Sequence, residues 1–138
     1  MNQKINAISK IFLLIMSLGM LSFSVFAQKQ EMVIGRKGVL DFKTSVRAGD
    51  TLLKSGTYQI QHVMEGTQHV LVIREIPSGQ GFRRGNTIPG KEVARLMCRF
   101  EPSEKKWKNT MIMLLTNDKG EKHISEVHVA GEKFVHLL

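Results

Sequence analysis

The chain has 138 residues, which is enough for one domain with a modest hydrophobic core. It carries 20 basic and 12 acidic side chains, so its net charge is +8 with neutral histidines. A single cysteine excludes an internal disulfide. Serine-hydrolase, phosphate-loop and dinucleotide-binding signatures are absent from the sequence. These features favour a non-catalytic domain that is held together by packing and strand pairing.

The first 27 residues have the pattern of a secretory signal peptide. Lys4 and Lys10 give it a basic start, and an apolar run over residues 11–26 follows. Residues 25–27, with the sequence VFA, place small side chains at the two positions that a signal peptidase reads. We therefore expect cleavage after residue 27.

The alternative for this segment is an uncleaved membrane anchor. A spanning helix needs about 20 apolar residues, and this run is shorter and is interrupted by serine and glycine. No cysteine lies near the cleavage site, so a lipid anchor is not expected. Cleavage leaves residues 28–138 with 18 basic and 12 acidic side chains, a net charge of +6. We expect this basic domain to be periplasmic or secreted from a bacterium.

The rest of the chain is a succession of short alternating or apolar segments between turns. About seven or eight such strands predict an all-β fold, a small antiparallel β-sandwich or barrel that forms a single domain over residues 28–138. Residues 28–36 are either an edge strand or a frayed terminus. The other expected strands are 39–44, 51–53, 57–63, 68–74, 92–100, 110–116, 122–129 and 134–138.

The clearest structural signal is a β-hairpin within residues 51–76. With a two-residue loop at 65–66, His62 faces His69 on the neighbouring strand. Because side chains alternate along a strand, Met64 lies on the same face as both histidines. A three-residue loop would shift the register and separate the two histidines.

Residues 92–100 fit two patterns. Val93 and Leu96 belong to a helical stripe, whereas Ala94, Leu96 and Cys98 fit one face of a strand. The flanking strands favour the strand, and a single helix is the alternative.

Two sequence patterns combine turn glycines with strand residues. They comprise Phe42, Gly49, Leu53, Gly56, Thr57, Tyr58 and Ile60, and later Ser125, Val127, Val129 and Gly131. On these residues the chain resembles a group of small exported bacterial proteins, many of them from soil bacteria, although Lys54-Ser55 replaces the Pro-Ala of that group. The resemblance implies export and an all-β fold, and it implies no biochemical activity.

His62, His69 and Met64 are the candidate metal ligands. Two imidazoles across a hairpin with a thioether nearby suit copper or zinc. The alternative is a polar sheet tip with Met64 packing, because the local sequence supplies neither a carboxylate nor a thiolate to complete the set.

The remaining histidines and the cysteine are assigned no site. We expect His123, His128 and His136 to be surface or packing residues. Cys98 could be a nucleophile with a histidine partner, but it lies in an apolar run without a local motif. We therefore expect it to be a small buried hydrophobe.

A second candidate site is a cationic group around one aromatic ring that could bind an anionic surface. Its residues are Arg83, Arg84, Lys105, Lys106, Trp107 and Lys108. The alternative is a solvated loop whose Trp107 folds back onto the core. The expected partners are envelope polysaccharide, lipid or another envelope protein, and export argues against nucleic acid.

The sequence therefore predicts an exported, non-catalytic β domain that acts by binding or as a structural component of the bacterial envelope. The alternative is a weak copper- or zinc-binding module that uses His62 and His69. A hydrolase-like enzyme is a second alternative.

Overall fold

A computed structural model describes residues 28–35, 38–78 and 90–138. The predicted signal peptide, Arg83, Arg84 and most of the loop before residue 90 lie outside the described residues. Within the described part, no helix is long and apolar enough to cross a membrane.

The described residues fold into strands, as the sequence predicts, and form no helix. The strands are β1 (Gln30–Gly35), β2 (Val39–Phe42), β3 (Val46–Ala48), β4 (Thr51–Leu53), β5 (Gly56–Glu65), β6 (Gln68–Ile76), β7 (Lys91–Pro102), β8 (Thr110–Thr116), β9 (Lys122–His128) and β10 (Phe134–Leu137).

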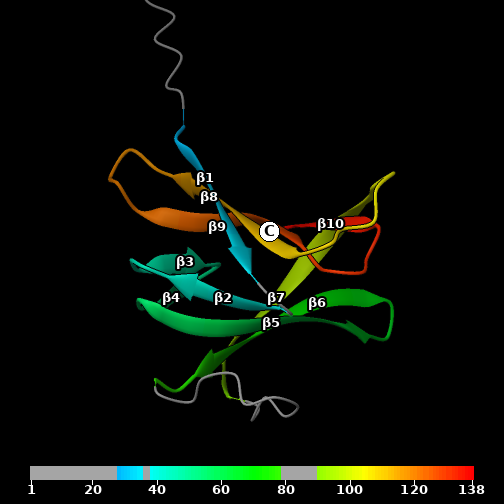
Figure 1. Cartoon of the computed structure of the whole chain (residues 1–138), viewed down its shortest axis with the longest axis horizontal. Helices are drawn as coiled ribbons and strands as arrows, with labels where there is room; N and C mark the ends of the chain where they lie inside the picture. Colours follow the sequence, from blue (N-terminus) through cyan, green and yellow to red (C-terminus); the bar gives the residue numbers. More distant parts are fainter. Residues whose placement is uncertain (1–27, 36–37, 79–89) are drawn as a thin grey trace, which may run out of the picture.

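Eight of these strands follow one another in the order β1-β8-β9-β10-β7-β6-β5-β2, with antiparallel pairing throughout. The two ends of this path, β1 and β2, contact each other, so the sheet nearly closes into a barrel (Figure 1). The short strands β3 and β4 form an added hairpin, and β3 also pairs in parallel with β9. Strand β3 is not among those predicted from the sequence.

Strand β7 links the two halves of the barrel. Residues 91–98 pair with β6, and residues 99–102 pair with β10. The prediction of a strand here is thus confirmed, and the helical alternative is wrong. The long strand places Cys98 beside the hairpin and close to the last strand of the chain.

The β5–β6 hairpin forms with a register that differs from the predicted one. Gly66 and Thr67 are the loop residues, and the pairs that follow include Met64 with His69. The prediction that His62 faces His69 is therefore wrong. Gly66 has a φ of 62°, which only glycine adopts without strain in a tight hairpin loop. The pairing is displaced by two residues, an even number, so both histidines stay on one face.

The core lies on the inner faces of the strands. Its buried members include Leu40, Phe42, Tyr58, Ile60, Leu71, Ile73, Ile112, Leu114, Ile124 and Val127. Burying one such aliphatic side chain contributes about 1.5–3 kcal/mol of hydrophobic free energy. On β5 and β6 the apolar inner face gives way to histidines toward the hairpin loop, so the core ends where the polar cluster begins.

Candidate metal centre

Three imidazoles meet on the inner face of the barrel at the edge of the core. They belong to His62 on β5, His69 on β6 and His136 on β10. One ring nitrogen of each residue lies within 4.8 Å of the corresponding atoms of the other two. His136 is fully buried, and the other two are half-buried. Three nitrogens this close together are a suitable ligand set for a transition metal.

The two hairpin histidines contact each other directly. Nδ1 of His69 lies 2.8 Å from Nε2 of His62, within hydrogen-bond distance. The two rings are stacked, with centroids 4.8 Å apart and an interplanar angle of 4°. The two residues are not directly paired in the sheet. They are diagonal neighbours on the same face of the hairpin, and this brings their rings into contact.

A single carboxylate, that of Glu132 in the turn between β9 and β10, holds two of the three imidazoles. Its Oε1 lies 2.8 Å from Nδ1 of His62, and its Oε2 lies 2.7 Å from Nε2 of His136. Burial alone would raise the pKa of Glu132, but the hydrogen bonds from His136 and His62 hold it below its usual value. Glu132 is therefore an ionised acceptor for both rings.

This acceptor fixes the tautomers of the two rings. An ionised carboxylate cannot donate, so Nδ1 of His62 and Nε2 of His136 must carry the protons. The lone pairs then lie on Nε2 of His62 and Nδ1 of His136. Burial lowers the pKa of His136, with the hydrogen bond to Glu132 opposing it, so this ring keeps its lone pair at neutral pH. A shared carboxylate thus leaves one nitrogen lone pair free of Glu132 on each of the two rings.

Cys98 completes the surroundings of the cluster. Its Sγ lies 3.4 Å from Nδ1 of His136 and 3.4 Å from the carbonyl oxygen of His69. Burial, together with the charge of Glu132, raises the pKa of the Cys98 thiol. The thiol is therefore protonated at neutral pH, and its single proton is donated to the carbonyl oxygen of His69, with Nδ1 of His136 at the same distance from the sulfur. Cys98 packs against the core as the sequence predicts, and it also reaches the histidines.

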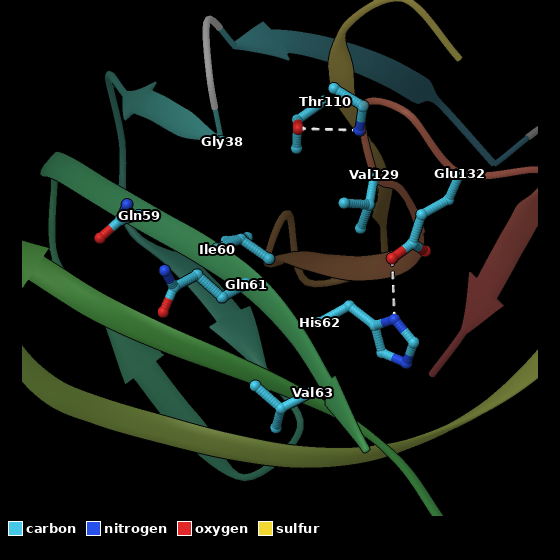
Figure 2. Close-up of a pocket in the computed structure, with 10 residues that line it drawn as sticks. Gly38, Gln59, Ile60, Gln61, His62, Val63, Thr110, Val129 and Glu132 are labelled. Atoms are coloured by element: carbon cyan, nitrogen blue, oxygen red, sulfur yellow. Dashed lines mark hydrogen bonds and ion pairs between the residues drawn. The ribbon is translucent and has the colours of Figure 1, made fainter. Parts of the chain in front are cut away.

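An open cavity of about 420 Å³ lies beside the cluster. His62 and Glu132 line this cavity together with Gln59, Gln61, Val63 and Val129. Figure 2 shows the His62 ring and the Glu132 carboxylate facing each other between β5 and the chain that follows β9.

The sequence-predicted ligands are placed unequally. His62 and His69 belong to the cluster. Met64 pairs with His69 in the sheet register, and 52% of its surface is exposed. His136 is predicted to be a surface or packing residue, but the structure places it in the cluster.

Trp107 does not form a common surface with the lysines of the predicted cationic group. Nε1–H of Trp107 donates to the carbonyl oxygen of Phe134 at 3.0 Å, and its ring packs on His128 with centroids 4.2 Å apart. Trp107 thus folds back onto the domain, whereas Lys105, Lys106 and Lys108 are exposed.

Sequence reasoning did not assign Glu132 and His136 to the site. It also missed the contact between Cys98 and His136. Glu132 follows a turn glycine, which makes it look like an ordinary loop acid. His136 lies 67 or more positions from the hairpin histidines in the sequence, and the pairing of β10 with β7 and β9 brings it near them. Glu132 and His136 are four positions apart, and this spacing was the one local signal that could have suggested a pair.

No protein-family model matches the chain, and neither a curated protein nor a solved structure matches it. The resemblance based on the glycine and strand residues stays a prediction.

Proposed function

We propose that this protein is an exported β domain that binds a transition-metal ion, copper or zinc, through His62, His69 and His136. The observation that carries the proposal is the shared contact of Glu132 with His62 and His136. Metal-ligating histidines commonly donate their second ring N–H to a carboxylate, which fixes the tautomer and strengthens the ligand. Here one carboxylate acts on two of the three rings.

The chemistry of the cluster favours metals that accept neutral nitrogen ligands. Imidazole suits copper and zinc, whereas calcium and magnesium prefer oxygen. His69 would give up its hydrogen bond to His62 when both rings turn their lone pairs to a metal. Three protein ligands beside a cavity leave a further coordination position, unlike the closed shell of a structural zinc site.

Export belongs to the same proposal. The basic start, the apolar run and the small residues before Gln28 support passage through a membrane into an oxidising or metal-exposed compartment. We infer that the mature domain acts in the bacterial envelope or outside the cell as a binding protein.

Calorimetric titration of residues 28–138 with zinc and copper(II) at about pH 7.5 tests the proposal. We expect one ion per chain for the wild type. His62→Ala, His69→Ala and His136→Gln should each abolish stoichiometric binding.

His123→Ala is the matched control, since His123 lies on β9 outside the cluster. It should bind as the wild type does. Circular dichroism checks that each variant keeps its strands. Absence of stoichiometric binding to the wild type, or equal binding by folded variants of the cluster, would contradict the proposal.

A further inference from the structure

Two sulfur-containing residues flank His69 on the inner face of the sheet. The register pairs His69 with Met64 on β5 and with Cys98 on β7, so the three side chains form one row across three strands. Residues that are directly paired in this way have Cβ atoms about 4.5–5.5 Å apart. A soft thiol and a soft thioether thus border the same imidazole.

Of the two sulfurs, Cys98 is the one that contacts the cluster. Its Sγ lies 3.4 Å from Nδ1 of His136, the nitrogen that Glu132 leaves unprotonated. A metal ion on that nitrogen would come into the space next to the sulfur. Because the thiolate and not the thiol is the form that binds metals, the S–H proton must leave if the sulfur is to coordinate the ion.

Two aromatic rings border the row. The ring of Phe100 lies against His69 with centroids 4.0 Å apart, and Phe134 packs on Phe100 at 5.5 Å. Soft sulfur ligands favour a soft, singly charged metal ion over a hard one.

We propose that Cys98 is a metal ligand and that the ion bound here is copper(I). This inference rests on the proposed metal-binding function and adds its ligand set and oxidation state. Copper(I) forms a bond to Sγ of Cys98 while the S–H bond breaks, and the proton passes to the buffer. The metal enters as copper(I) and stays copper(I), so no electron is transferred. His136 and at least one hairpin histidine supply the nitrogen ligands.

X-ray absorption at the copper edge tests the inference on anaerobic protein loaded with copper(I). We expect a sulfur scatterer in the wild type and in Met64→Leu, and only nitrogen scatterers in Cys98→Ser. Competition with a chromophoric copper(I) chelator should show at least about a tenfold loss of affinity in Cys98→Ser. Losing a residue that only hydrogen-bonds to a metal ligand already lowers metal affinity by this factor.

The outcomes separate this inference from the proposed function. If wild-type protein binds metal with nitrogen scatterers alone, or if Cys98→Ser binds copper(I) as tightly as the wild type, Cys98 is not a ligand and the histidine site stands. Loss of the sulfur scatterer in Met64→Leu but not in Cys98→Ser also overturns the inference. If the wild type binds neither copper nor zinc, both proposals fail. Cys98→Ala, checked by circular dichroism, replaces the serine variant if that variant does not fold.

Discussion

Nδ1 of His62 lies 2.8 Å from Oε1 of Glu132, although the two residues are 70 positions apart in the sequence. The backbone of Glu132 is held in position, because its carbonyl oxygen accepts a hydrogen bond from the amide of Trp107 at 3.1 Å. On the His62 side, β5 is paired along its length with β6. The carboxylate therefore meets the imidazole between two fixed pieces of backbone.

Glu132→Gln should lower metal affinity by roughly 10- to 100-fold, the usual cost of losing a carboxylate behind a ligating histidine. The amide keeps the size of the side chain, but its NH₂ group donates where the carboxylate accepts. One of the two histidines must then turn its lone pair toward residue 132 and away from a metal. Titration with zinc measures the change.

Glu126→Gln is the control for this substitution. Glu126 also contacts a histidine, since its Oε2 lies 3.2 Å from Nε2 of His128, but that histidine is outside the cluster. The metal affinity of Glu126→Gln should equal that of the wild type. Equal affinities for the Glu132 and Glu126 variants would show that the carboxylate does not orient the ligands.

Acid should destabilise the metal-free domain in two stages. Burial depresses the pKa of His136, so below the unfolded value of about 6.5 the unfolded chain takes up a proton that the folded chain refuses. Stability then falls with decreasing pH. Glu132, whose folded pKa is also depressed, contributes stability above its unfolded value of about 4.3 that is lost as the pH falls through its folded pKa.

Urea denaturation in the presence of a chelator between pH 8 and pH 4 measures this profile. His136→Gln should remove the first stage, the decline that begins near pH 6.5, whereas His123→Gln should retain it. A wild-type free energy of unfolding that stays constant between pH 7 and pH 5 would contradict the burial of His136 as a neutral ring.

Gly49→Ala should destabilise the domain more than Gly66→Ala. Both glycines have a left-handed φ, 56° and 62° respectively, which costs a residue with a Cβ about 1–2 kcal/mol. A Cβ at position 49 would also meet Cδ2 of Leu96 at 2.9 Å, whereas nothing lies within 4 Å of one at position 66. Thermal unfolding should show a fall of several degrees for Gly66→Ala and a larger fall for Gly49→Ala. Identical midpoints for the two variants would mean that Leu96 moves away freely.

Export should remove residues 1–27. When the full chain is produced in a bacterium with its own export machinery, mass spectrometry of the processed protein should find Gln28 at the N-terminus, either free or cyclised. The small residues before Gln28 are the reason. An intact Met1 on protein recovered from the membrane fraction would instead indicate an uncleaved anchor.

Local patterns were sufficient for every strand except β3 and insufficient for the site. The alternation around His62, Met64 and His69 placed the three side chains on one face, which survived a register error because the displacement was even. Glu132 and His136 joined them only through the pairing of β10 with β9 and β7. Such long-range pairing depends on how the whole barrel closes, and no short sequence window contains that information.

The cationic group shows the opposite error. Neighbouring positions in the sequence suggested that Trp107 and the adjacent lysines form one surface. The indole instead satisfies its N–H on the carbonyl oxygen of Phe134. A buried aromatic ring with a polar group gains more from such a partner than from exposure to solvent. Composition alone could not separate the ring from its charged neighbours.

The pairing of β1 with β8 also determines the order in which the barrel can assemble. Gln30 pairs with Leu115, so the first described strand has no partner on this edge until nearly the whole chain is present. Contacts between such distant segments slow folding, because a long loop must close before the pairing is gained. A chain that crosses a membrane with its N-terminus first would thus reach the far side with β1 still unpaired. The sheet would close late, after residues 110–116 had followed.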